Sequence, residues 1–119
     1  MSHDAAVAAF EKLYAELAKA QGYVQMRLAI LAKWQTLPDN EAKQLLVEVA
    51  AAELKRAQDS QAKALQKIKE AEIKEAEQVL AGARWPTAIA AAHAEIRRLR
   101  GQLALVRAGL ASDDADGQA

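Results

Sequence analysis

Three arginines form the most specific polar pattern in the sequence. Arg97, Arg100 and Arg107 are spaced by three and seven residues, which places them on one side of a helix, while Arg98 points elsewhere. Guanidinium groups in such a row can follow a phosphate backbone, and a helix can enter a major groove. The same side chains can instead shield the edge of an apolar seam or contact a protein. The formal net charge of zero favours the second interpretation.

Histidines and carboxylates are the groups that could bind a metal. His93 has no acidic or histidine neighbour three or four residues before it, and zinc needs three or four ligands at compatible spacing. A di-metal bundle site needs a Glu-x-x-His pair, which the sequence lacks. One stretch is rich in glutamate, but lysines interleave it, which indicates a solvated face: Glu70, Glu72, Glu75 and Glu77. We therefore expect no metal site.

Motifs for catalysis are also missing from the sequence. It contains no nucleophile elbow, no glycine-rich phosphate loop and no plausible Ser/His/Asp arrangement. It contains no cysteine, which excludes disulfides and thiolate metal sites. We expect no catalytic residue, no cofactor and no enzymatic activity.

The elements that carry these residues are set by two prolines, Pro38 and Pro86. Proline and the residue before it interrupt a helix, so the chain divides into three helical segments. These cover about 5–34, 40–81 and 88–111. Because the connections are short, we expect neighbouring helices to pack antiparallel.

Capping residues mark the helix starts. Asn40 alone, or Thr36 with Asp39, can cap the second helix, and Thr87 can cap the third. The two tryptophans, Trp34 and Trp85, fall at the connections. Each can cover the open end of a hairpin, with its indole N–H on a partner or water. Alternatively, the pair can anchor another protein, because tryptophan is enriched among residues that dominate binding energy.

Apolar residues recur by three and four in the first and third helices, which predicts heptad seams. The first seam, with Gln21 in its one gap, comprises Val7, Phe10, Tyr14, Leu17, Val24, Leu28 and Leu31. The third comprises Ile89, Ala92, Ile96, Leu99, Leu103, Val106 and Leu110. In the second helix, the large apolar residues are concentrated near the start.

Helix length predicts where the three segments meet. At 1.5 Å per residue they span about 45, 63 and 36 Å, so both outer helices overlap the second near residues 58–70. Leu65 and Ile68 are placed there to face two neighbours, and we regard them as candidate interaction residues with Trp34 and Trp85.

The composition limits how much surface the helices can bury. Of the 119 residues, 52% are hydrophobic but only 4% are aromatic. Alanine makes up roughly a quarter of the chain, and it buries little area. We predict an all-α fold, with three long helices in an elongated antiparallel coiled-coil-like bundle. Residues 1–111 would form one domain and 112–119 an acidic flexible tail.

These features predict a non-enzymatic module for protein–protein interaction: a scaffold, chaperone, inhibitor or tether. The thin core favours a homo-oligomer, a larger protein partner, or both. The alternative is a nucleic-acid-associated protein that uses the arginine row. No signal peptide or membrane-length apolar run is present, so we expect the cytoplasm, of a bacterium or an infected host cell. The alanine- and arginine-rich composition is typical of a GC-rich bacterial genome, or of a phage or plasmid within one.

Overall fold

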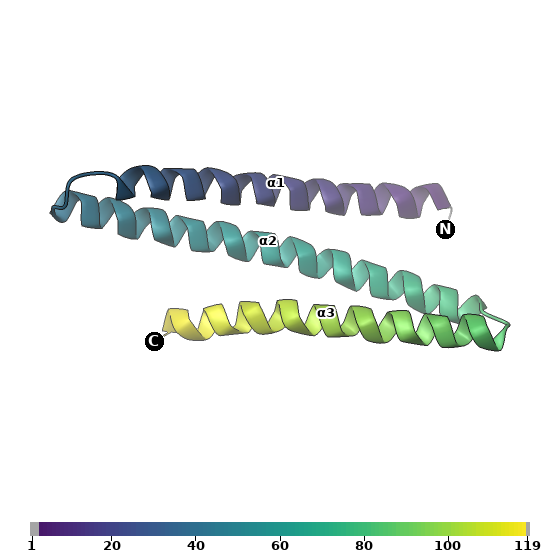
Figure 1. Cartoon of the computed structure of the whole chain (residues 1–119). Coiled ribbons are helices and arrows are strands. Elements are labelled where there is room, and N and C mark those ends of the chain that lie inside the picture. The colour runs from purple at the N-terminus through teal and green to yellow at the C-terminus, as the bar shows by residue number, and fades with distance from the viewer. Residues whose placement is uncertain (1–2, 119) are drawn as a thin grey trace. The chain divides into compact units, whose positions relative to one another are not determined.

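The computed structural model describes the backbone from residue 3 to 118 and the side chains from 4 to 110. It contains three helices, α1 (His3–Gln35), α2 (Glu41–Gly82) and α3 (Pro86–Gln118) (Figure 1). No strand occurs between residues 3 and 118. The predicted all-α class with three helices is therefore confirmed.

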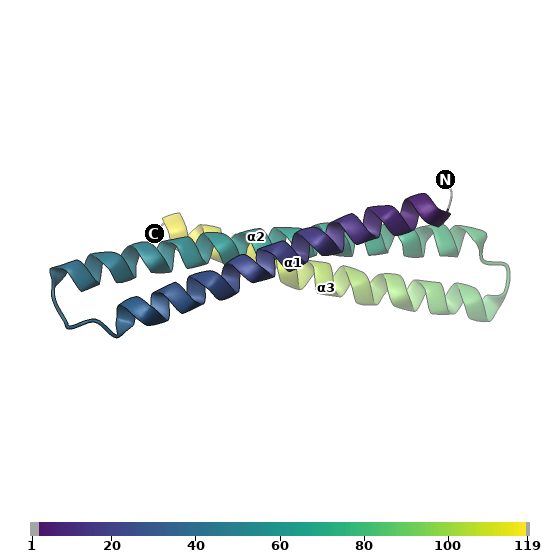
Figure 2. The same cartoon turned by 90° about the horizontal axis from the view of Figure 1, so that it is seen from above.

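The chain forms two compact units. Unit 1 comprises Met1–Phe10 and Leu65–Ala119, and unit 2 comprises Glu11–Ala64. Figure 2 shows that α2 is one uninterrupted helix, so it contributes its first half to unit 2 and its second half to unit 1. The single domain expected over 1–111 stays a prediction, because the units share this helix.

The first connection, residues 36–40, satisfies the backbone groups of both helices that it joins. At the end of α1, the Thr36 hydroxyl donates to the carbonyl of Lys33 over 2.7 Å. At the start of α2, the Asn40 side-chain oxygen accepts from the backbone N–H of Lys43 over 2.9 Å, as expected of an N-cap. The hydrogen bond from the Lys43 ammonium lowers the pKa of Asp39, and its charge adds to this effect.

The third helix begins earlier than the sequence predicted. The carbonyl of Trp85 accepts from the N–H of Ile89 over 2.9 Å, so Trp85, not Thr87, holds the cap position. Pro86 is the first helical residue, a position where its missing N–H costs nothing. At the other end, α3 continues to Gln118, beyond the predicted end at 111, since no proline interrupts it. The side chains of the predicted tail, 112–119, lie outside the described residues.

The α1 seam differs from the predicted one by half of its positions. Phe10, Leu17, Val24 and Leu31 are buried or half-buried, as predicted. The other predicted positions are exposed, with Val7 at 40%, Tyr14 at 52% and Leu28 at 40%. Their places are taken by Leu13, Ala20, Arg27 and Trp34.

Seven-residue spacing explains this error. The row Phe10, Leu17, Val24 can pair with the residues three before it or with those three after it, and each of these two rows is apolar at all but one position. The row that follows packs inward for two reasons. It contains Ala20 where the other row contains Gln21, and its one charged residue, Arg27, forms an ion pair with Glu53 of α2.

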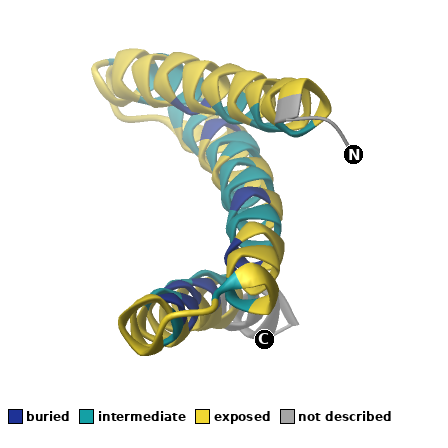
Figure 3. Ribbon diagram, turned by 90° about the vertical axis from the view of Figure 1, so that its right-hand side faces the viewer, coloured by how far each residue is buried: buried dark blue, intermediate teal, exposed yellow. Residues whose placement is uncertain are grey.

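The α3 seam is confirmed at every predicted position, from Ile89 to Leu110. Its central residues join α2 in the core of unit 1, which Figure 3 colours dark blue. This cluster comprises Ile73, Ala76, Ile96, Leu99 and Leu103, with Leu80 packed against it.

Unit 2 has a thinner core. Its buried apolar residues, among those described, are Val24 and Ala50. The remaining contacts between α1 and α2 come from half-buried side chains such as Leu17, Leu31 and Leu54. The apolar start of α2 contributes little to this core, since Leu45 is 63% and Val49 is 57% exposed.

Leu99→Ala tests the core of unit 1. Leu99 is 1% exposed, so the substitution should lower the free energy of unfolding by about 2–5 kcal/mol through lost contacts and a cavity. Leu105→Ala, on the same helix but 75% exposed, is the matched control and should change it by less than about 0.5 kcal/mol. Urea titrations followed by circular dichroism give both values. Equal effects would contradict the assigned seam.

Candidate protein-interaction site

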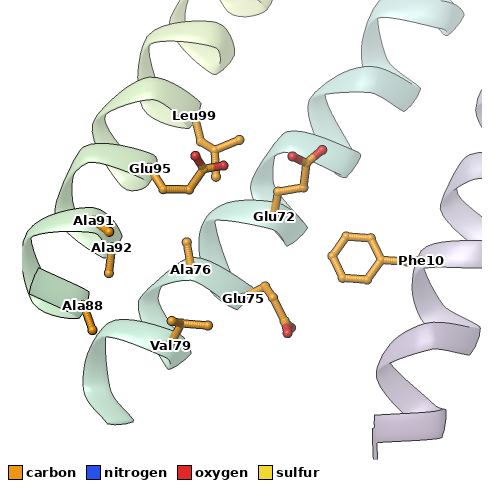
Figure 4. Close-up of a pocket in the computed structure, with 10 residues that line it drawn as sticks. All are labelled: Phe10, Glu72, Glu75, Ala76, Val79, Ala88, Ala91, Ala92, Glu95 and Leu99. Carbon is orange, nitrogen blue, oxygen red and sulfur yellow. The ribbon is translucent and has the colours of Figure 1, made fainter. Parts of the chain in front are cut away.

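Unit 1 carries an open groove between α2 and α3, with a volume of about 650 Å³. Figure 4 shows the residues that line it, including one aromatic ring that α1 directs toward it. The lining comprises Phe10, Glu72, Glu75, Ala76, Val79, Ala88, Ala91, Ala92, Glu95 and Leu99.

The floor of the groove is apolar and built mostly of small side chains. Ala76, Ala92 and Leu99 are buried, and Ala88 and Ala91 continue the surface along α3. Alanines leave a depression where larger residues would fill the space between two helices. Larger side chains stand beside this floor, since Phe10 is half-buried and Val79 is 58% exposed. The result is a water-exposed apolar channel.

The rim of the groove is acidic on both helices. Glu72 and Glu75 project from α2, and Glu95 projects from α3 (Figure 4). Glu72 has Lys69 at 3.6 Å, and Glu95 accepts a 3.0 Å hydrogen bond from Arg98, which lowers the pKa of Glu95. Each of these contacts lies within one helix, and the charge of Lys69 on α2 also helps to lower the pKa of Glu95 on α3.

The opposite flank of the same two helices carries another open hollow, of about 540 Å³, which is bridged by ion pairs. Arg100 lies 3.4 Å from a carboxylate oxygen of Glu77, and Arg107 lies 3.1 Å from one of Glu70. A hydrogen bond from Gln66, and then that from Arg107, lowers the pKa of Glu70. Ion pairs thus join α2 and α3 on this flank, whereas the charged residues that line the groove are all carboxylates.

These ion pairs bear on the predicted arginine row. Arg100 and Arg107 point toward α2 carboxylates, while Arg97 is exposed. The two pairs are half-exposed and therefore weak, yet they place negative charge beside each guanidinium. This arrangement agrees with arginines that shield the seam edge. The nucleic-acid alternative stays a prediction.

The other candidate residues differ in how far their side chains are exposed. Trp34 is half-buried, with the ammonium of Lys33 5.8 Å from its ring centroid, whereas Trp85 is 74% exposed. Leu65 is half-buried, and Ile68, at 1% exposure, offers almost no surface to a partner. Of these four residues, Trp85 is the most accessible.

Sequence reasoning missed a second apolar surface, on unit 2. A shallow hollow brings Tyr23 and Arg27 of α1 together with Glu53 and Arg56 of α2, which defines one flank of this hairpin. Helical spacing continues this flank toward the 36–40 connection. We call its exposed apolar residues the unit 2 flank: Tyr23, Met26, Leu45, Leu46 and Val49. The cluster of leucines and valines at the start of α2 was the available signal.

The described part of the chain lacks the features of two other types of site. No group of three or more His, Cys, Asp or Glu side chains there is arranged to hold a metal ion. No described helix has the length and apolarity needed to cross a membrane.

No protein-family model matches the chain, and no curated protein or solved structure is significantly similar to it.

Acid should destabilise unit 1 partly through Glu70. Because the pKa of this carboxyl is lowered from 4.5 in the folded state, the ionised form favours folding. That stability is present above pH 4.5 and is lost as the pH falls through the lowered value. The thermal midpoint should fall between pH 7 and pH 3, and in Glu70→Gln this fall should be smaller by about 1–3 °C.

Thermal melts followed by circular dichroism measure this difference. Glu48→Gln, at an exposed position of the same helix, is the control and should melt like the parent at both pH values. An acid-induced fall of the same size in Glu70→Gln and the parent would contradict a stabilising role for the Arg107 pair.

Proposed function

We propose that this chain is a non-enzymatic helical protein-interaction module that self-associates through the unit 2 flank. One observation carries the proposal: more large apolar side chains are exposed than are buried. Among the described residues, nine apolar side chains are buried, three of them alanines, while eleven large ones are exposed. Single exposed apolar residues are ordinary, but five of these eleven gather on the unit 2 flank.

The thin core of unit 2 supports a second copy as the partner. A hairpin with Val24 and Ala50 as its buried residues gains little stability from its own packing. A protein that covers the exposed apolar residues of unit 2, and so stabilises its fold, must be present wherever the chain is made. A second copy of the chain meets this condition. Two such hairpins can pair as a four-helix bundle.

The charges around this flank also suit a second copy. Arg27 and Glu53 pair within the flank, and Arg56 lies beside them. In a two-fold dimer the same patch of each copy meets, so a patch whose charges all have one sign would repel the patch of the other copy. A patch that contains both positive and negative charges can place an acidic side chain of one copy against a basic side chain of the other.

Scaffold, chaperone, inhibitor and tether all remain open as roles for such a module. The proposed compartment is the cytoplasm, of a bacterium or an infected host cell, which suits a chain without cysteine. We do not advance the nucleic-acid alternative, because carboxylates occupy Arg100 and Arg107.

Light scattering of the full chain after size-exclusion chromatography tests the proposal. The parent should have a concentration-dependent mass above the 12.8 kDa of one chain. Leu45→Glu with Val49→Glu places two carboxylates in the flank and should weaken association by at least about tenfold. Leu105→Glu, on the exposed side of α3, should leave the mass unchanged.

Two results would count against self-association through this flank. One is a fully helical parent with a mass of 12.8 kDa at every concentration. The other is a double variant whose mass equals that of the parent.

A further inference from the structure

We propose that the unit 1 groove binds an amphipathic helix of another protein, whose lysines or arginines meet the acidic rim. This inference rests on the proposed function, because it assigns the partner that an interaction module would take besides its own copy. It concerns a different surface, so the two can be tested separately.

The shape of the groove fits one face of a helix. Its floor follows two packed helices and repeats alanines at positions 88, 91 and 92 of α3. Large side chains of an incoming helix can enter this floor at the spacing i, i+3, i+4 and i+7, which is the ordinary pattern of helix-in-groove recognition. Phe10 and Val79 offer apolar contacts beside the floor. A polar ligand would find no buried hydrogen-bonding group among the lining residues, since the three polar ones are rim glutamates.

The charge of the rim selects a basic partner. Among the lining residues, Glu72, Glu75 and Glu95 are charged and none is cationic. Lys69 already forms an ion pair with Glu72, and Arg98 forms one with Glu95. Glu75 is exposed and has no ion pair with a described side chain, so it is the carboxylate most available to a partner's cation.

A second copy fits this groove poorly. Groove against groove would bring two acidic rims together in a two-fold dimer. Arg100 and Arg107 of α3 are engaged on the opposite flank, so they do not complement the rim. The groove therefore differs from the unit 2 flank, where both positive and negative side chains are present.

Two synthetic peptides test the inference. Each has about 18 residues, or five helical turns, with leucines at i, i+3, i+4 and i+7. One carries lysines beside the leucine stripe and the other carries glutamates. We expect fluorescence anisotropy to show that the full chain binds the lysine peptide at least about tenfold more tightly, with affinity falling as salt rises.

Substitutions locate the binding. Glu75→Lys reverses one of the three rim charges and should weaken binding of the lysine peptide by about tenfold. Ala91→Trp fills the floor and should abolish binding of either peptide while helicity is retained by circular dichroism. Glu48→Lys makes the same charge change outside the groove and should leave binding unchanged.

Four outcomes would overturn the inference: no binding of the lysine peptide, equal binding of both peptides, no effect of either groove substitution, or dissociation of a parent oligomer as the peptide binds. The last would mean that a second copy occupies the groove. Light scattering of the same samples separates the two proposals. Oligomers without selective peptide binding would overturn this inference alone, and selective binding by a 12.8 kDa species would overturn only self-association.

Discussion

The packing of α3 against the second half of α2 is the interaction on which the candidate site depends. Ile73, Ile96, Leu99 and Leu103 hold these helices at a fixed register. That register places arginines of α3 opposite glutamates of α2 on one flank, and glutamates opposite glutamates on the other. One flank is therefore bridged by ion pairs, while the other has an apolar floor and an acidic rim.

The abundance of alanine explains why the chain leaves surfaces uncovered. Alanine favours the helix strongly, so long helices form without a large core. It contributes little buried area when those helices pack. Unit 1 compensates with isoleucines and leucines, whereas unit 2 places its larger residues, such as Leu45 and Val49, outside its seam. Unit 2 therefore forms long helices without forming a large core, and its flank is left exposed.

Sequence reasoning succeeded where a local rule decides the outcome. Pro38 and Pro86 define the three helices, and the α3 seam has one apolar row and thus one register. It failed on α1, where two mostly apolar rows are each compatible with Phe10, Leu17, Val24 and Leu31, and packing against α2 decides between them. The groove could not be predicted either. In the sequence, all the glutamates of this stretch of α2 appear equally solvated, and only the packing against α3 shows which of them lie opposite arginines. The start of α3 shows the same limit, since Pro86 takes the first helical position and the cap is Trp85, two residues before the predicted Thr87.

Hydrogen exchange measured by mass spectrometry across a range of protein concentrations tests most directly whether unit 2 depends on a companion chain. Amides of residues 11–64 should exchange more slowly as the concentration rises, because association covers the hairpin, while those around Ile96 and Leu99 should be protected at every concentration. Protection of residues 11–64 that is already complete and unchanged at the lowest concentration would contradict the account.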